Sequence, residues 1–196
     1  ISFVPGNHDA LVKRAEKQKS LFFSKWMGSD DTISHPPYIQ RKGNVAFIGL
    51  DSAVATPPFF ASGRLGEAQL ARLAVLLKQA GEEGLCRVVL IHHPPLPGMA
   101  KWRKALKDAD KLEVVLQESG AELVLHGHNH HPIEKTLETV DGTTHVYGVG
   151  SSSMAYGHGK KTAAHYNIFC VTSDGIEQTQ RIYDTQTNKF VAYNPQ

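Results

Sequence analysis

Three short apolar runs of this sequence each end in a cluster of histidine or asparagine. The runs are Phe3-Val4 before Asn7-His8-Asp9, Leu90-Ile91 before His92-His93, and Val124-Leu125 before residues 126–130. Short apolar runs rich in β-branched residues predict buried strands. Loops that follow the carboxyl ends of such strands gather at one edge of an α/β sheet. The pattern therefore favours a fold that brings three polar loops together.

Strand and helix patterns alternate first, and hairpins dominate later. We expect helices over residues 10–27, 67–80 and 112–118, and strands over residues 1–4, 45–50, 87–91 and 122–125. In the second helix, Leu70, Leu73 and Leu77 fall on one face. Asp141-Gly142 and Asp174-Gly175 are typical of tight hairpin turns. The sequence predicts an α/β fold with mixed sheets, in a single domain over residues 1–196.

Composition excludes several classes of protein. The 196 residues are 41% hydrophobic and 20% charged, which excludes disordered and collagen-like chains. No apolar run approaches the roughly 18 residues of a membrane span. Charges of 21 Lys+Arg and 19 Asp+Glu nearly balance, so neither nucleic acid nor an anionic membrane is indicated as a partner. Cys86 and Cys170 lie in apolar, strand-like segments, so we expect buried free thiols and a cytoplasmic protein.

The residue types at the three strand ends are suited to binding metal ions. Imidazole and carboxamide donors favour Zn, Fe, Mn or Co over Ca or Mg. His128 and His130 are two residues apart, so an extended segment would present both on one side. Each cluster alone is an ordinary loop feature, but the three occur in order and each follows an apolar strand.

Together, Gly6-Asn7-His8-Asp9, His92-His93-Pro94 and Gly127-His128-Asn129-His130 resemble the last three metal-site blocks of the calcineurin-like metallophosphoesterase superfamily. Within it, the sequence is most similar to the branch of cyclic-nucleotide and glycerophosphodiester phosphodiesterases. The resemblance implies a layered α/β/β/α sandwich of two mixed sheets. It also implies hydrolysis of a phosphate ester, with attack by a hydroxide that bridges two metal ions (Mn, Fe, Zn or Co).

The same resemblance assigns roles to individual residues. Asn7, His92 and His128 are implied ligands of one metal ion, and His130 is an implied ligand of the second. His8 is the implied histidine that faces the oxygen of the leaving group. Two cations about 3.5 to 4 Å apart would stabilise charge on the attacking and leaving oxygens.

The sequence departs from the family pattern in its first two blocks. None of its nine aspartates is followed two residues later by histidine, and no glycine is followed by aspartate. Both Asp-x-His and Gly-Asp-x-x-Asp are therefore missing, and with them the bridging carboxylate. We expect these blocks to precede Ile1 in a longer chain, and residues 1–196 alone to be inactive.

Several neighbouring residues have two interpretations. His93 either contacts the metal ligands or the substrate, or it forms a structural hydrogen bond. Asp9 either orients His8 or caps the helix that follows. For His126 and His131 we favour structural roles. The basic residues around Trp102 either reach a substrate phosphate or nucleobase, or form a solvated face. That basic set is Lys101, Arg103, Lys104 and Lys107.

Three functions are compatible with these features. The short loops favour a small-molecule phosphodiesterase. A nuclease of the same superfamily would need many Lys/Arg–phosphate contacts, which the near-neutral charge disfavours. The third is a non-catalytic scaffold that binds a partner near Phe59-Phe60. The glycine- and lysine-rich segment at 157–161 lacks the pattern of a phosphate-binding P-loop.

Overall fold

The computed structural model describes residues 1–30, 35–156, 162–172 and 175–193. Its larger sheet has six strands in the order β1-β2-β3-β4-β6-β5. These are β1 (Tyr38–Lys42), β2 (Val45–Gly49), β3 (Cys86–Ile91), β4 (Leu123–His126), β5 (Ile133–Thr139) and β6 (Gly142–Gly148). The four central strands are parallel, whereas β1 and β5 pair antiparallel at the edges. The sheet is therefore mixed, as the sequence predicts.

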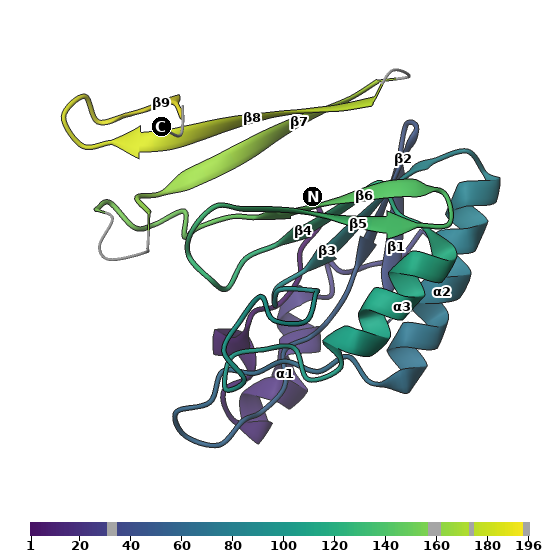
Figure 1. The fold of residues 1–196 in the computed structure, drawn as a ribbon. Coiled ribbons are helices and arrows are strands. Elements are labelled where there is room, and N and C mark those ends of the chain that lie inside the picture. The colour runs from purple at the N-terminus through teal and green to yellow at the C-terminus, as the bar shows by residue number, and fades with distance from the viewer. Residues whose placement is uncertain (31–34, 157–161, 173–174, 194–196) are drawn as a thin grey trace.

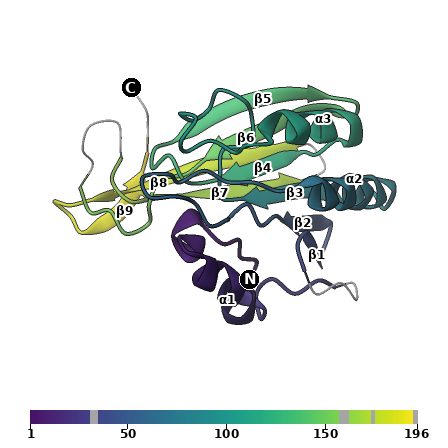
Figure 2. The same cartoon turned by 90° about the horizontal axis from the view of Figure 1, so that it is seen from below.

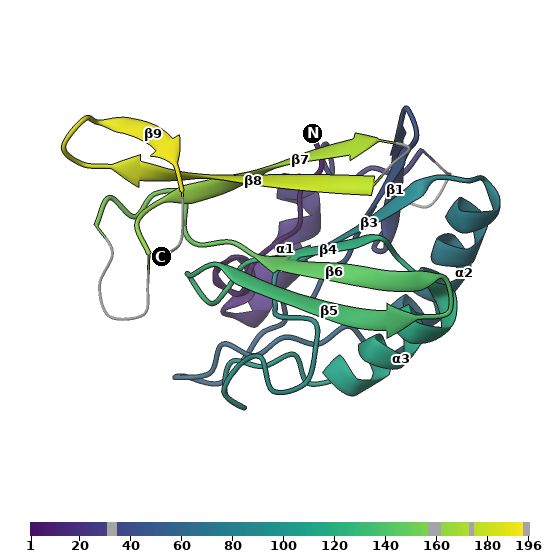
Figure 3. The same ribbon diagram turned by 45° about the horizontal axis from the view of Figure 1, so that its top comes forward.

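A second, smaller sheet contains β7 (His165–Thr172), β8 (Gly175–Asp184) and β9 (Lys189–Ala192), all antiparallel. It lies on the face of the six-stranded sheet opposite to α2 and α3 (Figures 1 and 3). A cavity of about 400 Å³ between the sheets is lined mainly by apolar side chains, among them Leu90, Leu125 and Phe169. The expected α/β fold with two sheets is confirmed.

Two helices, α2 (Glu67–Glu82) and α3 (Ala109–Ser119), pack against the other face of the larger sheet. Leu70, Leu73 and Leu77 of α2 are buried, as their helical spacing predicts. Both faces of β3 are covered, which explains its nearly continuous apolar sequence. The main core therefore lies between the two helices and the sheet.

One carboxylate joins the beginnings of these helices. Asp108 precedes α3, and its side chain accepts hydrogen bonds from the backbone N–H groups of Leu65 and Gly66, just before α2. Unpaired N–H groups at the beginning of a helix favour a negative charge there. Asp108 thereby fixes the two helices and the loops that precede them.

The structure differs from the sequence prediction near the N-terminus. Residues 1–4 form no strand; instead, the backbone N–H and C=O of Phe3 both hydrogen-bond to the Tyr38 hydroxyl. The helix expected over residues 10–27 is shorter, because a 3-10 helix, η1 (Asn7–Ala10), precedes α1 (Lys13–Phe23). Figure 2 places α1 apart from α2 and α3. Strand β1 was not expected, because its sequence ends in Gln-Arg-Lys rather than in apolar residues.

The expectation of buried thiols is wrong for one cysteine. Both Cys86 and Cys170 are free, but Cys86 is half-buried and Cys170 is exposed. Exposed and half-buried residues alternate along most of β7, and Cys170 falls on its solvent side. Among the described residues, no helix has the length and apolar character needed to cross a membrane.

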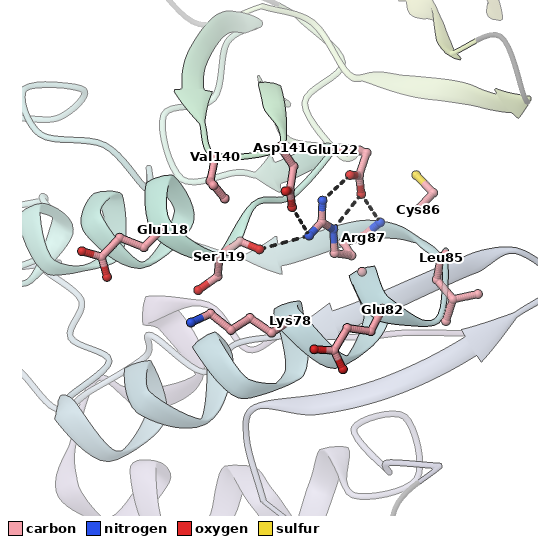
Figure 4. Close-up of a pocket in the computed structure, with 12 residues that line it drawn as sticks. Lys78, Glu82, Leu85, Cys86, Arg87, Glu118, Ser119, Glu122, Val140 and Asp141 are labelled. Atoms are coloured by element: carbon pink, nitrogen blue, oxygen red, sulfur yellow. Dashed lines mark hydrogen bonds and ion pairs between the residues drawn. The ribbon is translucent and has the colours of Figure 1, made fainter.

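Ionic contacts hold the larger sheet together at the amino ends of β3 and β4. The buried Arg87 side chain donates to Glu122 at 2.5 and 3.1 Å, to Asp141 at 2.8 Å and to the Ser119 carbonyl at 3.0 Å (Figure 4). These residues line a cavity of about 680 Å³. Because the histidine loops follow the carboxyl ends of the same strands, this network lies at the opposite end of the sheet.

Candidate metal centre

Neighbouring parallel strands bring two of the histidine loops together. Ile91, the last residue of β3, pairs with His126, the last residue of β4. The backbone N–H of Gly127 then donates to the His92 carbonyl at 3.1 Å, which connects the two loops directly. Strand register thus determines how close the two loops lie.

Three donor atoms converge at this point. His92 Nε2 lies 2.9 Å from Asn7 Oδ1 and 3.2 Å from His128 Nδ1, and the last two atoms are 3.2 Å apart. Two ligands bound at right angles, each about 2.1 Å from a metal ion, are about 3.0 Å apart. The triangle of Asn7, His92 and His128 therefore fits a single metal ion, with one oxygen and two nitrogen donors.

The environment keeps the two histidines of this triangle neutral. Burial lowers the pKa of His92 to about 4, with further lowering by the nearby His8, His130 and His126. Burial also lowers the pKa of His128 to about 4, with contributions from His92 and Lys104. A neutral imidazole has a lone pair available for a metal ion, so both rings are ready to act as ligands at neutral pH.

A glycine makes room for this arrangement. A Cβ atom on Gly6 would lie 2.9 Å from Cε1 of His92, which is closer than real side chains pack. We expect Gly6→Ala to displace either the His92 ring or Asn7, and to weaken metal binding by about 10- to 100-fold, the range seen when groups that position ligands are lost. Isothermal titration calorimetry with Mn²⁺ or Zn²⁺ would measure the affinity for the metal ion.

Gly28→Ala is the matched control, because a Cβ atom on Gly28 would lie an ordinary 3.7 Å from its nearest neighbour. Equal metal affinities of the two variants would contradict the prediction.

His93 lies beside the triangle and is hydrogen-bonded through both of its ring nitrogens. One of its ring nitrogens lies within 4.8 Å of a ring nitrogen of His92 and of His128. Nε2 is 3.2 Å from the Ala61 carbonyl and Nδ1 is 2.8 Å from the Ser52 hydroxyl. Because a carbonyl only accepts, Nε2 carries the proton and Nδ1 accepts from Ser52. Ser52 lies just after the end of β2, and the sequence analysis did not assign it a role. The available signal was that Asp51-Ser52 directly follows an apolar run, as the histidine clusters do.

The burial of His93 has a consequence for stability at low pH. Burial lowers its pKa from 6.5 to about 3 in the folded protein, so the unfolded chain binds more protons between these values. The free energy of unfolding should therefore fall as pH decreases below about 6.5, by up to about 1.4 kcal/mol per pH unit for this group. Denaturant unfolding of the metal-depleted protein at pH 7, 6 and 5 tests this. In His93→Gln, the free energy of unfolding should fall less steeply as pH decreases than in the wild type. The exposed His35→Gln is the control. Equal dependence on pH in the wild type and in His93→Gln would refute this prediction.

The left-handed backbone of the third loop was not expected. His128 and His130 have φ values of 67° and 60°, whereas the sequence suggested an extended segment. Such conformations are uncommon for residues with a side chain, and they typically occur at functional sites. His130 does not join the triangle, although it is close enough to lower the pKa of His92 and His128. Its role as ligand of a second metal ion stays a prediction.

The remaining histidines and Asp9 occupy distinct positions. His8 is exposed, and Asp9 accepts a hydrogen bond from the Gly6 N–H at 2.8 Å within the same turn. The Nδ1 atoms of His126 and His131 are hydrogen-bonded to the backbone carbonyls of Gly127 and Asn129. Asn129, another residue that sequence reasoning missed, donates to the Met99 carbonyl. Residues 157–161, weighed as a phosphate loop, lie outside the described residues.

Two of three comparisons with known proteins find similar proteins, and the third finds none. A search of curated proteins finds no match for the chain. Among solved structures, a dimetal phosphatase from Danio rerio is similar, with a TM-score of 0.49 and 14% identity. The match covers 74% of this chain and 53% of that one, so the chain spans about half the length of that structure. Residues 1–132 match the model of the calcineurin-like phosphoesterases, and the chain belongs to this family.

Proposed function

We propose that the protein is a metal-dependent phosphoesterase that hydrolyses a small-molecule phosphodiester. The observation that carries this proposal is the triangle of Asn7, His92 and His128, whose donor atoms lie within 3.2 Å of one another. Membership of the family supports a phosphate ester as the substrate. The net charge of +2 argues against a nucleic acid.

The roles of the residues follow from their chemistry. Asn7, His92 and His128 would hold one metal ion, and His130 would help to hold a second. Such ions, when bound, neutralise phosphate charge and make hydroxide available near neutral pH. Asn7 is an uncharged donor, so it leaves more positive charge for the phosphate than a carboxylate would. The exposed His8 follows Asn7 directly and would donate a hydrogen bond to the oxygen of the leaving group.

The proposal is tested by reloading the full-length protein with metals. After chelation and dialysis, Mn²⁺, Zn²⁺, Fe²⁺ and Co²⁺ are added separately, and hydrolysis of bis(p-nitrophenyl) phosphate and p-nitrophenyl phosphate is measured. We expect metal-dependent hydrolysis, faster for the diester, and about two bound metal ions per chain. Faster hydrolysis of the monoester would contradict the diester preference, and no hydrolysis with any metal would contradict the enzyme proposal.

The same measurements distinguish the other functions. Failure to retain any metal would favour the non-catalytic scaffold. A nuclease would be favoured if the protein cleaves DNA and its affinity for DNA falls steeply as the salt concentration rises. Such salt dependence is expected because contacts between basic side chains and phosphates release counterions from the DNA. Among the described residues, no aspartate or glutamate joins the histidine cluster, so the expected carboxylate ligands stay a prediction.

A further inference from the structure

We propose that Arg103, with Phe60 and Trp102 beneath it, forms an anion subsite for a second phosphate group of the substrate. The inference rests on the proposed phosphoesterase function and specifies its substrate class. The substrate would carry one phosphate at the metal centre and a second, separate phosphate group on the part of the molecule that reaches Arg103.

Hydrogen bonds attach this subsite to the metal centre. Ala61 donates its N–H to the Arg103 carbonyl at 2.9 Å, while the Ala61 carbonyl is bonded to His93. The His93 ring in turn lies 4.6 Å from the His128 ring, centroid to centroid. On the other side, Asn129, next to His128, donates to the Met99 carbonyl at the beginning of the same loop. The basic loop is thus held beside the metal centre from both sides.

The positive charge of the loop is not neutralised within the described part of the chain. Residues 99–107 include Lys101, Arg103, Lys104 and Lys107 but no acidic residue. None of these four side chains forms an ion pair with a described residue. The carboxylate of Asp108, which follows them, is already bonded to the N–H groups before α2. The loop therefore presents a positive surface that a substrate anion would neutralise.

Aromatic rings hold Arg103 in place without removing its charge. The centre of its guanidinium lies 5.5 Å from the centroid of Phe60 and 5.3 Å from that of Trp102. These two rings are 5.2 Å apart and nearly perpendicular, at 80°. The aromatic rings leave the charge of the guanidinium in place, and its planar set of N–H donors matches two oxygens of a phosphate. Lys101 and Lys104, both exposed, lie within two residues of it in the sequence.

The experiment compares two substrates that differ by one phosphate. Thymidine 5′-(p-nitrophenyl phosphate), with or without a 3′-phosphate, presents the same bond for cleavage and the same leaving group. With the Mn²⁺-loaded protein, the bisphosphate should have a KM at least about tenfold lower, the effect of one charge-assisted contact. Arg103→Gln should remove most of this preference through KM, while kcat/KM for the monophosphate stays within about twofold.

Matched variants and a binding measurement complete the test. Lys189→Gln removes an exposed cation from β9 and should keep the preference. Arg103→Lys keeps the charge but loses the planar donor pair, so its preference should be intermediate. Calorimetry of the metal-depleted protein with thymidine 3′,5′-bisphosphate and thymidine 5′-phosphate gives a readout that does not need activity. Here too, Arg103→Gln should lose the preference for the bisphosphate.

The outcomes separate this inference from the proposed function. Hydrolysis of both substrates with equal KM, or a preference that survives in Arg103→Gln, would overturn the subsite and leave the phosphoesterase intact. No hydrolysis of either substrate would contradict the phosphoesterase, and the calorimetric comparison would then decide the subsite alone. Equal binding of both nucleotides by the wild-type protein would overturn it.

Discussion

His128→Ala is expected to abolish metal binding at the Asn7–His92–His128 triangle, and phosphodiester hydrolysis with it. The variant removes one of three donors that lie within 3.2 Å of one another. Loss of a group that only positions a ligand costs about 10- to 100-fold in metal affinity, so loss of a ligand should cost more than about 100-fold. Competition with a chromophoric chelator measures the affinity, and release of p-nitrophenol measures the rate.

The control is His35→Gln, since this histidine is exposed and outside the cluster. It should bind metal and turn over like the wild type. Asn7→Ala should match His128→Ala, because it removes the oxygen donor of the same triangle. Unchanged turnover in both Asn7→Ala and His128→Ala would refute the assignment of these ligands.

Arg87→Met is expected to give the largest loss of stability without direct contact to the metal centre. The Arg87 side chain is only 5% exposed, and its removal leaves Glu122 and Asp141 without their cation. Breaking a fully buried ion pair costs about 3–5 kcal/mol. Both carboxylates are partly hydrated, so we expect a smaller loss of about 2–3 kcal/mol in the free energy of unfolding, measured by urea denaturation.

A more exposed ion pair between β1 and the end of α2 provides the comparison. Arg41 forms an ion pair with Glu83, but the Arg41 side chain is more accessible to water than that of Arg87, so Arg41→Met should cost clearly less stability than Arg87→Met. Metal affinity should be unchanged in Arg87→Met, because Arg87 lies at the amino end of β3. A loss for Arg87→Met no greater than that for Arg41→Met would show that burial adds nothing here.

The parts of the fold that sequence reasoning predicted are those with strong periodicity. Strand 87–91 and helix 67–80 were placed within two residues of β3 and α2, because burial enforces their apolar patterns. By contrast, β1 is an edge strand rich in polar residues, so it lacks an apolar pattern that would predict a strand. It forms a strand because it pairs with β2 in the folded protein. Residues 1–4 have a strand-like sequence, but among the described residues they bond to side chains of β1 rather than to its backbone. Ser2 Oγ donates to Gln40, and the backbone of Phe3 bonds to the Tyr38 hydroxyl.

The site was only partly predictable for similar reasons. Which strands end in histidines can be read from the sequence, and Asn7, His92 and His128 do come together. His92 and His93 are adjacent and identical, so apart from the family resemblance the sequence does not indicate which of the two would be a ligand. The difference between them depends on Ser52 and Ala61, which are remote in sequence and occupy both nitrogens of His93. The left-handed backbone of His128 and His130 likewise has no sequence signal as clear as glycine.

The alignment of β3 with β4 also limits how such a chain can change during evolution. A shift of one residue along a parallel strand moves a side chain by about 3.3 Å, as much as the whole separation between the donor atoms of the triangle. An insertion or deletion within either strand would therefore eliminate the metal centre even if the sheet still formed. The β5–β6 turn at Asp141-Gly142, on the far side of the sheet, faces no such restriction from the metal centre. Lengthening that turn is compatible with an intact site, although it would disturb the contact of Asp141 with Arg87.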